Sequence, residues 1–291
     1  MKKILVTGAT GNLGSLTIDH LLNKKHVSAE RIVAMVRDKK RAEHLSNKGV
    51  ELRVGDYNDM DSLKEAFTGI EKLLVVSSPS LDNVERLKQQ YNVVMAAKLA
   101  NVKHTFLVSL ADADKRLFGL EDVDMATEHM IRAVDLPFTF MRNGVYLDEI
   151  KFDLKNAIGK EELVSSTISN GFNFVLRSDL ALANATVLSE EGHENKIYNL
   201  VNSELITYPE IASILTEITG TEIGYRESSD KEVIKNLTDS GVSKEGAELL
   251  VLSFQKNIAE GAFQSTSDDL NQLIGECSTK KAIASIIEFS D

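Results

Sequence analysis

The sequence predicts an α/β protein with a doubly wound parallel sheet and a smaller C-terminal α+β lobe. Short apolar runs alternate with helical patterns through the first half of the chain, and a glycine-rich turn, TGATGNLG, follows the first run. After residue 145 the alternation weakens and helical patterns dominate. Strands that alternate with helices form right-handed crossovers and a parallel sheet. A glycine-rich turn after the first strand makes this a Rossmann-type fold.

Six short, largely β-branched runs are predicted as strands of the first domain: 4–6, 32–36, 50–54, 73–76, 105–108 and 138–141. Amphipathic stretches lie between them, such as Met60–Leu63–Phe67, which ends before Gly69. We place this domain at residues 1–145, completed by segments that return from the second half.

The smaller lobe is placed at residues 146–291. Helical patterns there cover residues 147–159, 179–190, 207–219 and 228–257, and short strands are expected at 172–176, 196–201 and 222–226. No linker rich in Gly, Ser or Pro separates the two halves.

Composition excludes several classes of function. The 291 residues are 43% hydrophobic and carry a net charge of −11, which disfavours nucleic acid and anionic membranes as partners. Cys277 is the single cysteine, so no disulfide forms within the chain, and the histidines show no metal-ligand spacing. No run has the length of a membrane span or the pattern of a signal peptide, so we expect a cytoplasmic protein without metal.

The glycine-rich turn is an anion-binding candidate. Three glycines stand three residues apart, and the turn opens a helix whose N-terminus carries partial positive charge. Gly8 permits the tight turn, Gly11 lets the backbone approach a pyrophosphate, and Gly14 lets the helix pack closely. The alternative is a tight strand–helix turn that holds no ligand.

Arg37 decides which dinucleotide the turn would hold. Proteins that bind NAD place an Asp or Glu at the end of the second strand, where it bonds the ribose 2′-hydroxyl. Here Arg37 follows that strand, and a guanidinium can donate two parallel hydrogen bonds to a 2′-phosphate. The neighbouring acid Asp38 is an argument against NADP, because a carboxylate would repel the 2′-phosphate. The alternative for the basic residues that continue to Arg41 is the solvated start of a helix. Asp56 is a candidate for contact with adenine, or alternatively a helix N-cap.

Several segments together carry a family resemblance: TGATGNLG, VRD, GDYND, KLLVVSS, FLVSL, MRNGVY and, near residue 190, EEGHENKIY. They resemble the NmrA-like group of atypical short-chain dehydrogenases, and most of all its bacterial type-2 NAD(P)H:quinone oxidoreductases. The resemblance runs along nearly the whole chain. It implies NADP as cofactor, a small quinone-like substrate, and a homodimer.

The resemblance also implies roles for individual residues. The pyrophosphate would lie on the turn, which comprises Gly8, Ala9, Thr10, Gly11, Asn12, Leu13 and Gly14. The remaining cofactor contacts would be Arg37, Asp56, Ser77, Ser78, Pro79, Ser109, Asn143, Gly144, Val145 and Tyr146. Asn143 and Tyr146 would also serve catalysis, together with His129.

His129 marks a departure from the ordinary short-chain dehydrogenases. They use Tyr-x-x-x-Lys, and alignment puts Met125 at the tyrosine and His129 at the lysine. The tyrosine protonates the alkoxide formed from a ketone, whose conjugate acid has a pKa near 15.7, as for water. A quinone yields a phenolate with a pKa near 10, so the demand for an acid is about 8 kcal/mol smaller. The missing tyrosine therefore favours a quinone or an extended cationic dye as acceptor. The alternative is an NADP(H)-binding redox sensor of the same fold.

Overall fold

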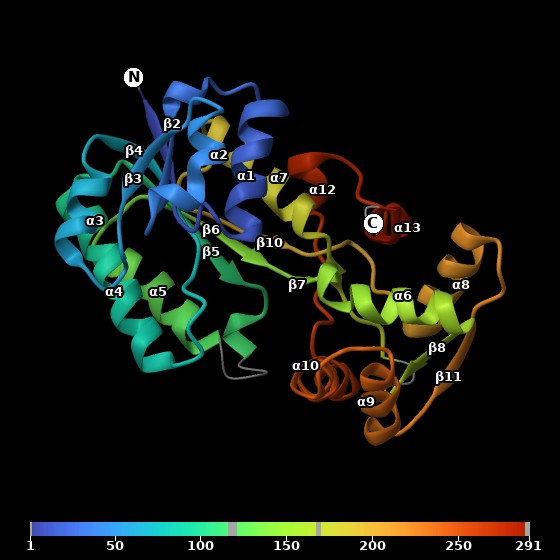
Figure 1. Cartoon of the computed structure of the whole chain (residues 1–291). Helices are drawn as coiled ribbons and strands as arrows, with labels where there is room; N and C mark the ends of the chain where they lie inside the picture. Colours follow the sequence, from blue (N-terminus) through green and yellow to red (C-terminus); the bar gives the residue numbers. More distant parts are fainter. Residues whose placement is uncertain (1, 116–120, 167–169, 289–291) are drawn as a thin grey trace. The chain divides into compact units, whose positions relative to one another are not determined.

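The computed structural model describes residues 2–115, 121–166 and 170–288. The chain divides into two compact units (Figure 1). The first consists of Met1–Asn143 and Ser178–Leu200, and the second of Gly144–Arg177 and Val201–Asp291.

The first unit is built on a parallel sheet, which has seven strands in the described part of the chain. Its spatial order is β10-β6-β5-β4-β1-β2-β3, and every pair is parallel. The strands are β1 (Lys3–Val6), β2 (Ile32–Val36), β3 (Glu51–Val54), β4 (Ile70–Val75), β5 (His104–Leu110), β6 (Phe138–Asn143) and β10 (Lys196–Leu200). All six strands predicted for the first half are present, and the fold class is confirmed.

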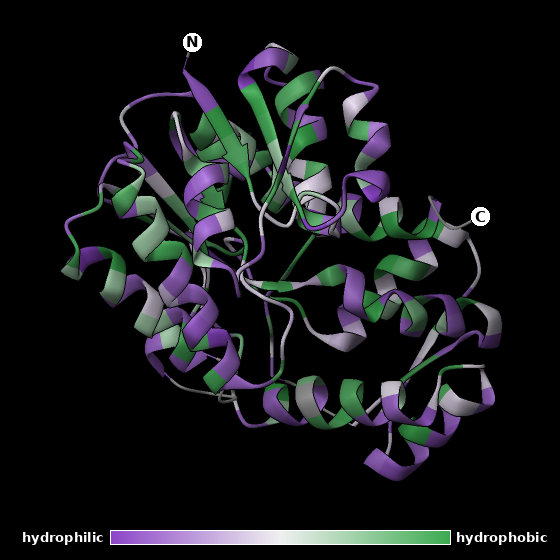
Figure 2. Cartoon of the chain, turned by 60° about the vertical axis from the view of Figure 1, so that its left-hand side comes forward, coloured by the Kyte–Doolittle hydropathy of each residue, from purple (hydrophilic) through white to green (hydrophobic). Residues whose placement is uncertain are grey.

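Helices cover the sheet because its strands are apolar on both faces. All five residues of β2 are buried, and Figure 2 shows the strands of the sheet largely in the hydrophobic colour. Phe67, Val93 and Ile131 pack in one core cluster with Leu73 and Phe140 of the sheet. These three side chains come from α3 (Met60–Phe67), α4 (Asn83–Leu99) and α5 (Glu121–Ala133), which therefore share one face.

On α1 (Asn12–Asn23), the ring Nε2 of His20 lies 3.1 Å from Ser178 Oγ of α7 (Arg177–Ser189). This contact holds α1 next to α7. The short α2 (Glu43–Ser46) lies between β2 and β3 along the chain.

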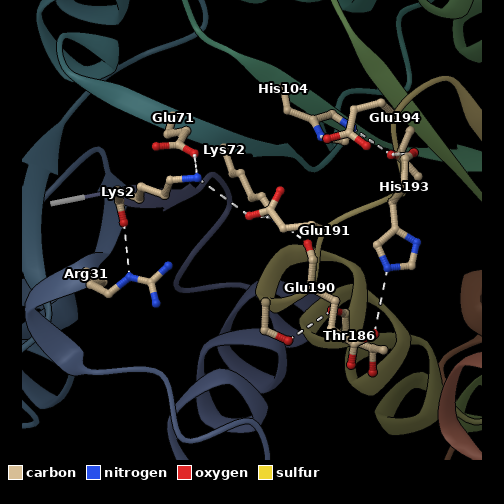
Figure 3. Close-up of polar contacts among 12 residues, drawn as sticks. Lys2, Arg31, Glu71, Lys72, His104, Thr186, Glu190, Glu191, His193 and Glu194 are labelled. Atoms are coloured by element: carbon tan, nitrogen blue, oxygen red, sulfur yellow. Dashed lines mark hydrogen bonds and ion pairs between the residues drawn. The ribbon is translucent and has the colours of Figure 1, made fainter.

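Charged and polar contacts at the amino ends of β4, β5 and β6 hold the segment before β10 (Figure 3). Lys72 Nζ donates a hydrogen bond to the carbonyl of Glu190 and lies 3.7 Å from Glu191 Oε1. Thr139 Oγ1 donates to the carbonyl of His193 at 2.6 Å, so the ring of His104, 2.8 Å away, must donate from Nε2. Burial of the ring lowers the pKa of His104 to about 4. This region therefore keeps the imidazole neutral.

The second unit holds two small parallel sheets in its described residues. In one, β7 (Val145–Tyr146) pairs with β9 (Phe174–Val175); in the other, β8 (Glu162–Ser165) pairs with β11 (Gly224–Glu227). The helices are α6 (Lys151–Lys160), α8 (Tyr208–Thr219), α9 (Asp230–Asp239), α10 (Lys244–Leu250), α11 (Lys256–Ala259), α12 (Asp269–Ile274) and α13 (Thr279–Glu288).

The predicted helical region 228–257 is divided in the structure. Helix α9 ends before Gly241, which has a φ of +95°, and Ser243 caps α10. A π-helical turn, Val251–Gln255, then leads into α11. Strand β8 and helices α12 and α13 were not predicted from the sequence.

Candidate functional site

The turn between β1 and α1 presents open backbone amides. Gly8 has a φ of +58°, and Gly11 N donates to Gly8 O at 2.9 Å, which closes the turn. Gly11 is the N-cap of α1, where no side chain caps the helix and no acidic residue stands in the first turn. The first amides of a helix have no partner within the helix, so they are free to bind an anion.

The two later glycines of the turn differ in how closely the backbone approaches them. A Cβ on Gly14 would stand 2.3 Å from Gly8 O and 2.8 Å from Gly8 C, so only glycine lets α1 pack against the turn. A Cβ on Gly11 would lie 3.2 Å from the same oxygen, a tight contact that a small shift relieves. Gly14 therefore serves packing, whereas the bare backbone at Gly11 leaves room above the turn.

A cavity of about 420 Å³ lies at the carboxyl ends of β1 to β4, all within the first unit. Ligands bind at this edge of open parallel sheets. The cavity is lined by eleven predicted cofactor residues: Gly8, Thr10, Gly11, Asn12, Leu13, Gly14, Arg37, Asp56, Ser77, Ser78 and Pro79. The sequence did not point to eight others: Met35, Val36, Arg41, Gly55, Tyr57, Asn58, Val76 and Gln89.

Two arginines line the cavity beyond β2. Arg37 follows the strand and Arg41 lies four residues later, both with exposed side chains. The carboxylate of Asp38 accepts a hydrogen bond from the amide of Lys40 at 2.9 Å and caps the short 3-10 turn. Asp38 therefore has a local structural role, and the two guanidinium groups give this end of the cavity a positive charge.

The loop after β3 forms another wall. Asp56 Oδ1 accepts from Asn58 N at 2.8 Å, while Asp59 caps α3, so the alternative that Asp56 is the N-cap is wrong. The hydroxyl of Tyr57 lies 2.7 Å from Thr7 Oγ1 and 2.8 Å from Val76 O, and burial raises its pKa. Tyr57 thus ties this loop to the ends of β1 and β4.

Ser109 does not line the cavity, because its hydroxyl is engaged inside the protein. It donates to Glu128 Oε1 at 2.7 Å, and Glu128 also receives two hydrogen bonds from Arg142, at 2.9 and 2.8 Å. Only 1% of Glu128 is exposed. The contact with Glu128 raises the pKa of Arg142. Such a bidentate buried pair fixes the ends of β5 and β6 against α5.

Helix α5 buries two acidic side chains next to the aligned positions of the tyrosine and lysine. Asp124 and Glu128 are buried, whereas Met125 is half-buried and His129 is exposed. The inward pair therefore stands one residue before the aligned positions of the tyrosine and lysine. His129 does not line the cavity, and its catalytic role stays a prediction.

The remaining predicted residues are distributed between the two units. Ala9 is fully buried in the turn. Asn143 ends β6 with 2% exposed, and both polar atoms of its side chain are buried without a hydrogen-bond partner in the described part of the chain. Gly144, Val145 and Tyr146 belong to the second unit, where the guanidinium carbon of Arg177 lies 4.5 Å from the centre of the Tyr146 ring.

Two kinds of feature are absent from the described residues. They contain no group of three or more His, Cys, Asp or Glu that could hold a metal ion. In that same part of the chain, no helix is both long and apolar enough to cross a membrane.

Comparisons with known proteins agree on one family. The model of the NmrA-like family matches residues 1–281. Quinone oxidoreductase 2 of Escherichia coli is 34% identical over 279 residues, which cover 96% of each chain. Among solved structures, the triphenylmethane reductase of Citrobacter sp. complexed with NADP(H) superimposes with a TM-score of 0.91 at 40% identity, covering 98% of this chain and 99% of the other. An NADPH-dependent quinone oxidoreductase from Escherichia coli complexed with NADPH gives 0.86 at 32% identity, with the same coverage.

Proposed function

Because the chain belongs to the NmrA-like family, we propose that it is an NADPH-dependent reductase that transfers a hydride to a quinone or a similar extended conjugated acceptor. Two of the similar proteins support the cofactor, since their structures are complexes with NADP(H) and NADPH. The names quinone oxidoreductase and triphenylmethane reductase support the class of acceptor.

The observation that carries this proposal is the combination of an anion-binding turn with Arg37 and Arg41 in one cavity. The cavity volume of about 420 Å³ lies in the range of ligand sites, and its position at the strand ends suits a dinucleotide. The amides at the start of α1 suit a pyrophosphate, and two guanidinium groups suit a further phosphate. Asp38, the one acid in this basic run, accepts a hydrogen bond from the amide of Lys40 and so has a local role as the cap of the turn that follows it.

Bound NADPH would supply the hydride. The chain's own residues would bind and orient the dinucleotide. The amides of the glycine-rich turn would donate hydrogen bonds to the pyrophosphate, and Arg37 and Arg41 would attract the further phosphate. The loop that Tyr57 holds in place would form one wall of the site. A quinone leaves a phenolate that water can protonate, so no tyrosine acid is required at Met125. Placement of the acceptor and exclusion of competing reactions then account for the catalysis.

An NADP(H)-binding sensor is the second candidate, and one observation favours it. His129 stands where the short-chain dehydrogenases carry a lysine that holds ribose, yet its side chain is exposed and does not line the cavity. The residue that would hold the ribose for hydride transfer is therefore missing from the cavity, which a protein that only binds the cofactor tolerates better than a reductase does.

Consumption of NADPH distinguishes the two candidates. The absorbance of the reduced nicotinamide is followed with a simple benzoquinone, with a triphenylmethane dye and with neither. Acceptor-dependent oxidation supports the reductase. Tight NADPH binding without oxidation by any acceptor supports the sensor, and lack of NADPH binding rejects both.

A small-molecule acceptor is the partner that this function requires. The homodimer expected from the resemblance stays a prediction, and sedimentation of the purified chain measures it directly.

A further inference from the structure

The hydroxyl of Ser77, on the wall of the cavity just beyond β4, is surrounded by polar groups from three other elements. Gln90 Nε2 of α4 lies 3.2 Å from Ser77 Oγ, and Asp124 Oδ1 of α5 lies 3.1 Å from it. The carbonyl of Val108 in β5 is 3.3 Å away. This hydroxyl therefore connects the cavity to an interior network.

Asp124 is the charged centre of that network. It is 6% exposed, and its second carboxylate oxygen lies 3.5 Å from Nη2 of Arg86 on α4, which is also 6% exposed. Glu128 is the neighbouring acid on α5. Burial, reinforced by the charge of Glu128, raises the pKa of Asp124 to about 6, against the opposing effect of Arg86 and of the bond to Ser77.

The single proton of the Ser77 hydroxyl determines which of its hydrogen bonds it donates and which it accepts. A serine hydroxyl has one proton and two lone pairs, and a carboxylate can only accept. The proton of Ser77 goes to Asp124, because a charged acceptor at 3.1 Å is preferred to the carbonyl at 3.3 Å. The amide of Gln90 donates to one lone pair of Ser77. One lone pair remains.

We propose that Asp124 is a positioning residue, which acts through Ser77 to make this wall of the cavity accept a hydrogen bond from a ligand hydroxyl group. This inference rests on the proposed function, in which the ribose of a dinucleotide supplies such hydroxyl groups. In this arrangement helix α5 contributes to ligand binding through the buried carboxylate of Asp124, one residue before the aligned position of the tyrosine.

Protonation of Asp124 reverses the direction of its hydrogen bond with Ser77. A neutral carboxyl group donates its proton toward Ser77, which then holds two incoming hydrogen bonds and no longer offers a lone pair to the ligand. The groups that face Asp124 are Ser77 from the loop after β4, Arg86 from α4 and Glu128 on its own helix. Affinity for a ligand hydroxyl is therefore expected to fall as the pH falls through the pKa of Asp124.

Calorimetric titration with NADPH across the pH range around the pKa of Asp124 tests this role. Ser77→Ala and Asp124→Asn should each weaken binding about three- to tenfold, the effect of one hydrogen bond. The double variant should be no weaker than Ser77→Ala, because Asp124 acts through that hydroxyl. Both single variants should lose the pH dependence that the wild type shows, and Asp124→Glu should restore part of the affinity.

Asp153→Asn is the matched control, since Asp153 is a buried carboxyl of the second unit that lines a different cavity. It should leave NADPH affinity unchanged. Thermal unfolding of each variant checks folding, and if Asp124→Asn does not fold, Asp124→Glu and the pH profile of Ser77→Ala decide. Unchanged affinity in Asp124→Asn, or additive losses in the double variant, would overturn the inference and leave the proposed function standing. A wild type that does not bind NADPH would overturn both.

Discussion

The guanidinium of Arg177 lies over the ring of Tyr146, 4.5 Å from its centre, and is held there by two carboxylates. Its Nη2 donates to Glu149 at 2.6 Å, and its Nη1 lies 3.5 Å from Asp148 Oδ1. Asp148 also accepts from the backbone amide of Arg177 at 2.8 Å, at the start of α7. Arg177 therefore orients the aromatic ring that the sequence assigns to catalysis.

Arg177→Met should remove the cation–π interaction between Arg177 and the ring of Tyr146. Methionine keeps an apolar stem over the ring but removes the charge, so the coupling measured against Tyr146→Leu in a double-mutant cycle should be about 1 kcal/mol. Urea unfolding of the wild type, the two single variants and the double variant gives this number. Additive effects of the two changes would show that the stacked geometry contributes nothing to stability.

Arg37→Ala should remove the preference for NADPH. A charge-assisted bidentate contact contributes about 1.5–3 kcal/mol, so NADPH affinity should fall about ten- to hundredfold while NADH affinity stays nearly constant. Calorimetric titration of both cofactors measures this. Lys39→Ala is the matched control, because Lys39 belongs to the same basic run but does not line the cavity. Equal affinities for the two cofactors in the wild type would contradict the prediction.

The pattern of apolar runs predicted the sheet well, because a parallel sheet buried on both faces requires such runs. It could not identify Arg41, since nothing local shows that a 3-10 turn carries this side chain back to the cavity. Tyr57 was also missed: its contacts with Thr7 and Val76 join segments far apart in sequence. The sequence also did not single out Asp124, because its contacts with Arg86 and Ser77 join segments that are far apart along the chain.

Gly11→Val should abolish NADPH binding and leave the protein folded. A side chain there would occupy the space above the turn, whereas its Cβ meets only Gly8 O, at 3.2 Å. Gly14→Ala is the contrasting variant, because its Cβ would stand 2.3 Å from that oxygen. It should cost about 1–3 kcal/mol of stability through overpacking. Circular dichroism and NADPH titration separate the two effects, and binding retained by Gly11→Val would mean that the turn holds no phosphate.

His104 should make the protein less stable in mild acid. Its pKa is lowered from 6.5 to about 4 in the folded state, so the unfolded chain binds more protons between these values. The stability is fully present above pH 6.5 and is lost as the pH falls toward 4, by about 3 kcal/mol at most. Urea unfolding as a function of pH should show a smaller loss for His104→Gln. His44→Gln, which changes an exposed ring on α2, should behave as the wild type.

His129 should aid placement of the cofactor without donating a proton. The alignment of His129 with a lysine that holds ribose in short-chain dehydrogenases and the low protonation demand of a quinone product both motivate this prediction. His129→Lys should then keep or improve quinone reduction, and His129→Ala should mainly raise the KM for NADPH. A general acid would behave differently: His129→Ala would lower kcat by about 10²–10⁴.

Steady-state kinetics of the wild type and both variants, with kcat and the KM for NADPH measured separately, distinguish these roles. His26→Ala provides the control, since His26 is another exposed histidine of the first unit outside the cavity. It should leave KM and kcat at their wild-type values. A large fall in kcat for His129→Ala with little change in the KM for NADPH would assign the proton transfer to His129 and reject the positioning role.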